Sequence, residues 1–174
     1  MADTPSPPPP EVDTRLRAQF GDAILAFEDS FGEPVATVAR ERYHALVKFL
    51  RDDPGFAFDY CDFSSAVDYG EDGIEIVTQL FSTTLHHRIR VKFRLAPDDL
   101  SYPTISDLYP TADWHERENM EMFGVVVQGH PKPVKLLLPE PFEGHPLRKD
   151  FVLMSREAKP WPGSPEGEEI EDDE

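Results

Sequence analysis

The sequence predicts an α+β protein: a two-layer domain with a mostly antiparallel sheet and packed helices, followed by an extended proline-rich C-terminal arm. Three observations support this class. Two alternating segments, 74–81 and 85–95, are joined by a turn short enough for a hairpin. Residues 40–51 carry an apolar stripe with helical spacing. Residues 130–165 contain eight prolines, which disfavour helix interiors and central strands.

The N-terminal third is predicted to contain two helices and a strand pair. A short helix over 12–20 precedes Gly21, and segments 23–27 and 34–39 have the composition of strands joined by a turn at 30–33. The second helix, 40–51, ends before Pro54 and Gly55. Its apolar side is formed by residues at the spacing i, i+3, i+4 and i+7, namely Tyr43, Leu46, Val47 and Leu50.

The middle of the chain is predicted to supply most of the sheet. In 56–63, Phe56, Phe58 and Tyr60 are expected on one side, and Gly70 and Gly73 bracket an acidic turn. In 74–81 the apolar side is formed by Ile74, Ile76 and Leu80, and in 85–95 by Leu85, Ile89, Val91, Phe93 and Leu95. The other side of 85–95 is basic. It is interpreted as a solvated face or a contact with acidic groups, and residues 52–75, with eight acids and no base, are the candidate counterpart.

A third helix is predicted over 111–123. Asp113 has the position of an N-cap with Glu116 three residues later, the spacing of a capping box. Arg117 and Glu121 are expected to form an i, i+4 ion pair, and Gly124 ends the helix. Glu116 and Glu118 lie about 200° apart on such a helix, so they do not converge for acid–base chemistry.

Composition narrows the possible functions. The chain has 174 residues and a net charge of −17, which argues against charge-driven nucleic-acid binding. The single cysteine excludes an internal disulfide and a self-contained iron–sulfur cluster. No apolar run approaches the ~20 residues of a membrane span, and no signal peptide is apparent. We therefore expect a cytoplasmic protein that reaches a membrane only through a partner.

The composition also divides the chain into four parts. We expect a disordered proline-rich leader over 1–10, the α+β domain over 11–128, an extended docking arm over 129–163 and a disordered acidic tail over 164–174. The arm carries many apolar side chains, which must pack on its own domain or on a partner. Its length favours a partner.

The residues do not form a recognisable active site. No phosphate loop, Gly-x-Ser-x-Gly elbow or His-Glu-x-x-His motif occurs, and His86 and His87 should point to opposite faces of a strand. His130 and His145 each lie in Gly-His-Pro. A metal site there would need a further ligand such as His115, Glu143 or Asp150. The favoured interpretation is two tight turns whose imidazoles hydrogen-bond backbone.

Four segments together resemble a known family: Ala112-Asp113-Trp114-His115-Glu116-Arg117-Glu118-Asn119-Met120-Glu121-Met122-Phe123-Gly124, Gly129-His130-Pro131, Leu136-Leu137-Leu138-Pro139 and Gly144-His145-Pro146-Leu147-Arg148-Lys149-Asp150-Phe151. They are similar to the thirty-kilodalton subunit of respiratory complex I, which is the C subunit of bacterial NADH–quinone oxidoreductase. The segment 159–163 is similar to actinobacterial members. The sequence departs from the family pattern at Met120, Glu121, Val127 and 132–135.

The resemblance implies a structural subunit without catalytic residues, metal or cofactor of its own. The flavin, iron–sulfur clusters and quinone would belong to the rest of a proton-translocating complex. The subunit would dock on the forty-nine-kilodalton protein and other hydrophilic-arm subunits near the quinone-reducing end, as a peripheral protein on the cytoplasmic side of the cell membrane. The alternative is the homologous subunit of a membrane-bound group-four nickel–iron hydrogenase or formate hydrogenlyase. The expected interface residues are Glu116, Arg117, Glu118, Phe123, His130, Pro131, Leu136, Leu137, Leu138, His145, Pro146, Leu147, Arg148 and Lys149.

Overall fold

The computed structural model describes residues 11–153 and confirms the predicted α+β class. The predicted leader 1–10, the end of the arm from residue 154 and the acidic tail lie outside the described residues. Within 11–153, no helix has the length and apolarity to cross a membrane. The helices are α1 (Val12–Phe20), α2 (Tyr43–Asp52) and α3 (Ala112–Phe123), and the strands are β1 (Ile24–Ser30), β2 (Glu33–Val38), β3 (Tyr60–Asp68), β4 (Ile74–Phe81), β5 (Arg88–Leu95), β6 (Ser101–Pro103) and β7 (Val126–Gln128).

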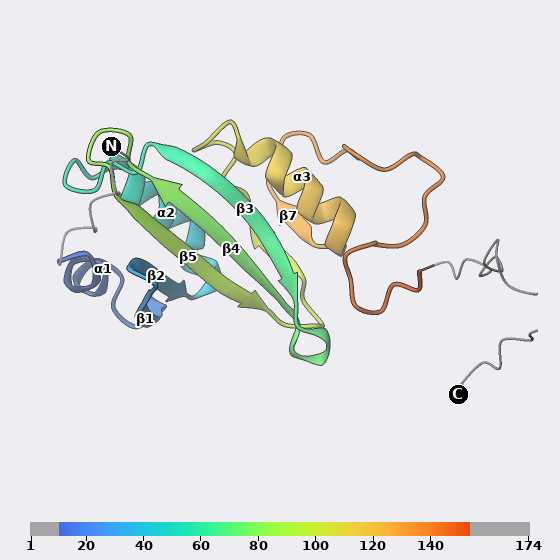
Figure 1. Cartoon of the computed structure of the whole chain (residues 1–174), viewed down its shortest axis with the longest axis horizontal. Helices are drawn as coiled ribbons and strands as arrows, with labels where there is room; N and C mark the ends of the chain where they lie inside the picture. The colour runs from blue at the N-terminus through green and yellow to red at the C-terminus, as the bar shows by residue number, and fades with distance from the viewer. Residues whose placement is uncertain (1–10, 154–174) are drawn as a thin grey trace, which may run out of the picture.

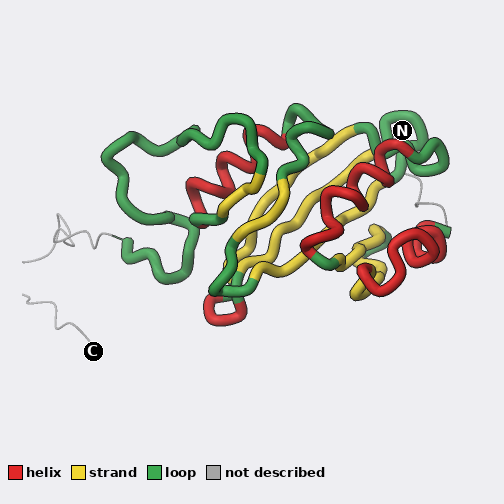
Figure 2. Tube along the Cα trace, turned by 180° about the vertical axis from the view of Figure 1, so that it is seen from behind, coloured by secondary structure: helices red, strands yellow, loops and turns green. Residues whose placement is uncertain are grey.

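The main sheet has five strands in the order β1-β2-β5-β4-β3. Its neighbours are antiparallel except β2 and β5, which are parallel. Strands β6 and β7 form a separate parallel pair beside α3. In Figure 1 the face of β3, β4 and β5 toward the viewer is uncovered and α2 lies behind it. Figure 2 shows α2 across the sheet from that other side.

The predicted stripe of α2 forms the middle of the core. Tyr43, Leu46, Val47 and Leu50 are all buried, because their spacing places them on the side of the helix that faces the sheet. The Tyr43 ring lies 4.6 Å from the Phe93 ring of β5, and Phe93 lies 5.6 Å from Tyr102 of β6. The Tyr43 hydroxyl is hydrogen-bonded to Thr78 at 2.7 Å, so its burial leaves no polar group unpaired.

Two strand predictions need correction. The segment 56–63 is not one alternating strand. Phe56 and Phe58 are buried in a loop, and β3 begins at Tyr60, which is 46% exposed. Leu85 is also exposed, because the turn before β5 extends through His87. His86 is exposed in this turn, whereas His87 is buried and contacts the Phe56 carbonyl at 2.7 Å.

The basic side of β5 is paired with acids, but not chiefly with the predicted ones. Arg88 and Arg90 both contact Glu33, at 3.3 and 3.2 Å. Lys92 contacts Glu28 at 3.0 Å. Of the four basic side chains of β5, only Arg94 pairs with the predicted segment 52–75, through Glu75 at 3.6 Å. The parallel β2–β5 pairing explains this result, because it places the β1–β2 hairpin beside β5.

Candidate partner interface

Helix α3 contacts residues 129–153, the segment after β7, which we call the arm. The predicted capping box is wrong: the N-cap residue is Thr111, and no side chain caps the helix. Gly124 ends the helix in the left-handed conformation, as expected. Arg117 and Glu121 are not paired with each other in the described structure. Arg117 instead pairs with Asp113 at 3.7 Å.

Glu116 is directed away from the helix end and into the domain. Its side chain is fully buried and accepts hydrogen bonds from the Thr104 hydroxyl at 2.5 Å and the Ile105 N–H at 2.7 Å. Burial raises the pKa of Glu116 to about 7, although both donors act in the opposite direction. The carboxyl therefore anchors the loop after β6 to α3. This long-range contact replaces the local N-cap contact that the spacing predicts.

His130, at the start of the arm, is buried next to Glu116. Its Nδ1 accepts the Lys132 N–H at 3.1 Å, so its Nε2 carries the proton and donates to the Asp113 carbonyl at 3.2 Å. Its Nε2 also lies 3.8 Å from Glu116. Both Gly129 and Gly144, which precede the two histidines, have positive φ angles of 79° and 84°. The predicted turns with backbone-bonded imidazoles are therefore confirmed.

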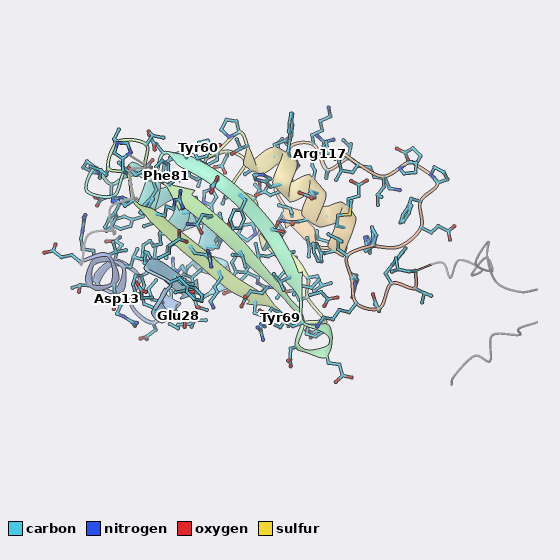
Figure 3. The ribbon with its side chains drawn as sticks, viewed as in Figure 1. Asp13, Glu28, Tyr60, Tyr69, Phe81 and Arg117 are labelled. Atoms are coloured by element: carbon cyan, nitrogen blue, oxygen red, sulfur yellow. The ribbon has the colours of Figure 1, made fainter. Side chains whose placement is uncertain are left out.

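Side chains of α3 hold the backbone of the arm. Arg117 donates to the carbonyls of Val134 and Lys135 at 2.9 and 3.0 Å. Glu121 accepts three consecutive backbone N–H groups, at 3.1, 2.8 and 2.7 Å, from Leu136, Leu137 and Leu138. Burial alone would raise the pKa of Glu121, but these three donors outweigh it and hold that pKa below its ordinary value. Figure 3 shows Arg117 on the part of α3 beside the arm.

Further contacts fix the second half of the arm, residues 145–149, to the domain. His145 Nδ1 donates to the Glu121 carbonyl at 2.8 Å, and its ring lies against Gly124, where an added Cβ would be 2.5 Å from Nε2. The Leu147 N–H donates to the Met122 carbonyl at 3.1 Å, and the Lys149 N–H to Asp68 at 2.7 Å. The arm therefore packs on its own domain, the alternative that length had disfavoured.

This mode of attachment uses the backbone and leaves apolar side chains exposed. Leu137 is 60% and Leu147 53% exposed, and Val134 and Leu136 are also exposed. Next to them lies a groove of about 350 Å³ between the start of β3, α3 and the arm. We call it the helix–arm groove. Its walls include Tyr60, Asp62, Trp114, His115, Glu118, Leu136 and Leu137. Exposed aromatic and apolar side chains of this kind are common on surfaces that bind other proteins.

The predicted interface residues fall into three groups. Glu116, Phe123 and His130 are buried within the chain, so in this conformation they can only position other residues. Arg117 holds the arm backbone, whereas His145, itself in the arm, donates to the backbone carbonyl of Glu121 in α3. The remaining predicted residues are at least partly accessible, and they are Glu118, Pro131, Leu136, Leu137, Leu138, Pro146, Leu147, Arg148 and Lys149.

Sequence reasoning missed three groove residues and one anchor. Trp114 is 67% exposed on α3, and Tyr60 and Asp62 come from β3, fifty residues earlier in the chain. Glu121 was predicted only as an ion-pair partner. An exposed tryptophan in a helix was a usable signal for Trp114, whereas the contribution of β3 required the fold. Among residues 11–153, no group of three potential metal ligands is brought together.

Comparisons with known proteins agree on one relationship. The family "Respiratory-chain NADH dehydrogenase, 30 Kd subunit" matches residues 36–157. The chain is 39% identical over 150 residues to the C subunit of an NADH-quinone oxidoreductase from Roseiflexus castenholzii, covering 85% of this chain and 86% of the relative. It is 38% identical to the subunit of the same name from Saccharopolyspora erythraea, covering 80% of this chain and 57% of that relative.

Two solved structures share the fold. A trypsin-resistant fragment of Nqo5 superposes with a TM-score of 0.60 and 22% identity, covering 70% of this chain and 98% of the fragment. A chain of the membrane-bound sulfane sulfur reductase, an archaeal respiratory membrane complex, gives a TM-score of 0.66 at 22% identity. That match covers 83% of this chain and 85% of the other. At this level of identity, both matches establish the fold alone.

Proposed function

Because this chain belongs to the family of the 30-kDa subunit of respiratory-chain NADH dehydrogenase, we propose that it is a structural subunit that docks on the forty-nine-kilodalton subunit. In this proposal the chain contributes no catalytic residue and no cofactor. The flavin, iron–sulfur clusters and quinone are held by other subunits of a proton-translocating NADH–quinone oxidoreductase. The subunit is peripheral and lies on the cytoplasmic side of the membrane, near the quinone-reducing end.

The observation that carries this proposal is the way in which the arm is held. Arg117 and Glu121 bind its backbone, while Leu137 and Leu147 remain more than half exposed. Exposed apolar groups in a fixed arrangement are typical of a surface that another protein covers. The accessible interface residues, from Glu118 through Lys149, are proposed to form this contact. Glu116 and His130 are proposed to position the arm from within the domain.

The test is purification of the affinity-tagged full-length chain from native membranes. We expect the forty-nine-kilodalton subunit and other hydrophilic-arm subunits to co-purify. A truncation that removes residues 134–174 keeps the buried His130 and should lose these partners while the domain retains its secondary structure. Association that survives the truncation would contradict the arm proposal. A stable monomer that brings down no larger subunit would contradict the function itself.

The second candidate is a membrane-bound hydrogenase or formate hydrogenlyase that uses the same module. This candidate is supported by the fold that the chain shares with a chain of the sulfane sulfur reductase. That match indicates that the same fold also occurs in a respiratory membrane complex of another kind. The same purification distinguishes the two. Co-purifying flavin-containing subunits support the NADH–quinone oxidoreductase, whereas a large partner with cysteine ligands for nickel supports the hydrogenase.

A further inference from the structure

The helix–arm groove combines large apolar side chains from three parts of the chain. Trp114 of α3 is 67% exposed, Leu137 of the arm 60%, and Tyr60 of β3 46%. All three line one groove of about 350 Å³. Figure 3 places Tyr60 at the start of β3, on the side of the sheet toward α3. Aromatic side chains of this kind supply a large share of binding energy where a partner covers them.

The charged side chains that line the groove are both acidic. Asp62 and Glu118 both line it, and the described lining residues include neither lysine nor arginine. The salt bridges within residues 11–153 involve neither of these two carboxylates. His115 also lines the groove, and its Nδ1 is buried without a hydrogen-bond partner in the described part of the chain. Because that nitrogen is covered by protein atoms, the polar side chains that a ligand meets first are the carboxylates of Asp62 and Glu118.

We propose that the helix–arm groove binds a segment of a partner chain that carries an arginine or lysine beside an apolar residue. The cation lies between Asp62 and Glu118, and the apolar residue packs on Trp114 and Leu137. This inference rests on the proposed function, because it assigns the chemistry of the partner segment at that docking surface.

Charge distinguishes this occupant from the two others that the chain itself could provide. A second copy has a net charge of −17 and would bring further negative charge to an acidic groove. The chain's own residues 154–174 contain Arg156 and Lys159 but eight acids, a net charge of −6. Both are disfavoured beside Asp62 and Glu118, whereas a locally basic segment of another subunit is favoured.

The first experiment measures association of the full-length chain with its co-purified partners. The paired variant Asp62→Asn with Glu118→Gln should weaken association about tenfold or more and reduce its dependence on salt. Trp114→Ala should weaken it to a similar extent with its salt dependence kept. The matched control is Glu140→Gln with Glu143→Gln, which removes two exposed carboxylates elsewhere on the arm and should change nothing. Thermal unfolding checks that each variant remains folded.

The second experiment identifies the occupant directly. A photo-crosslinking amino acid replaces Leu137 in the full-length chain within the assembled complex, and the adduct is sequenced. The expected adduct is a peptide of another subunit with an arginine or lysine within a few residues of the crosslink. An adduct to residues 154–174, to a second copy, or to a partner peptide without a basic residue overturns the proposal.

The two proposals fail in different ways. If the full-length chain co-purifies with no larger subunit, the proposed function is wrong. If it co-purifies normally but Trp114→Ala and the paired acid variant assemble as well as the control, the docking function stands and the groove assignment is wrong.

Discussion

Residues 11–128 and the arm, residues 129–153, are stabilised in opposite ways. In the domain, side chains such as Phe93 are buried and backbone groups pair in helices and strands. In the arm, several backbone groups pair with side chains of α3, and apolar side chains such as Leu137 and Leu147 remain exposed. The difference shows that a segment without helix or strand can be ordered through its backbone. Its side chains are then available for recognition.

The largest expected difference between the two regions is in the unfolding free energy that is lost when an apolar side chain is shortened to alanine. Phe93→Ala removes a ring packed between Tyr43 and Tyr102 and should cost about 3–5 kcal/mol of unfolding free energy. Leu137→Ala, a truncation in the exposed arm, should cost under ~0.5 kcal/mol. Denaturant unfolding followed by circular dichroism measures both. Equal losses for the two variants would remove the distinction between domain and arm.

The next effect tests whether the arm is held through its backbone. Glu121→Ala leaves the N–H groups of Leu136, Leu137 and Leu138 without their acceptor, at a cost of roughly 1–3 kcal/mol for the attached arm. Hydrogen exchange should become faster at these three amides and stay unchanged in β4. Glu140→Ala is the control, since that side chain is exposed. Unchanged exchange at 136–138 would contradict the assigned role of Glu121.

The raised pKa of Glu116, which lies between the two regions, predicts that the unfolding free energy depends on pH. Its pKa rises from 4.5 to about 7 on folding, so the folded state holds the proton more tightly. This group therefore stabilises the fold fully below pH 4.5, and its contribution is lost as the pH rises toward 7. Glu116→Gln keeps a donor and an acceptor and should remove this loss, on the order of 1–3 kcal/mol.

The measurement compares unfolding free energies at pH 5 and pH 8 for the natural chain and Glu116→Gln. The variant should change less between the two pH values. The same substitution at the exposed Glu71 serves as the control and should leave the pH profile as it is. A Glu116→Gln profile that matches the natural chain would show that Glu116 is ionised in the folded state throughout this range.

The smallest expected effect is at Lys135. Its Nζ contacts the carbonyls of Pro139, Glu140 and Phe142 at 3.5, 3.1 and 3.2 Å, all on the exposed side of the arm. Lys135→Met removes these contacts and should lower the unfolding free energy by only about 0.5 kcal/mol, because water can replace the lost donor. Calorimetry checks this, with Lys132→Met as the control. A loss above about 2 kcal/mol would mean that the arm contributes to global stability as the core does.

Most of the domain was predictable because its signals are local. The spacing of Tyr43, Leu46, Val47 and Leu50 indicated α2, and alternation gave β4 its observed bounds. The errors arose where contacts distant in sequence replaced local ones. Glu116 binds the loop at Thr104 instead of capping its own helix. Arg117 and Glu121 each bind the arm rather than one another.

The candidate interface could be predicted only in part. The family resemblance and the apolar, proline-rich composition pointed to 129–163 as a docking arm, and the glycines indicated its two turns. Which side of that segment faces outward could not be predicted, because it has no helical or strand period. Tyr60 and Asp62 reach the groove only because β3 lies beside α3. These two elements are some fifty residues apart in the sequence, so no local pattern indicates the contact.

The position of β5 has a consequence for synthesis of the protein. β5 lies between β2 and β4 in the sheet, although it follows both in the chain. During translation, the β1–β2 hairpin and the β3–β4 pair are both made before the strand that joins them. Each exposes an unpaired strand edge until residue 95 has left the ribosome. Until then, these two edges are available for pairing with other chains, which makes the interval before β5 the stage of synthesis most exposed to aggregation.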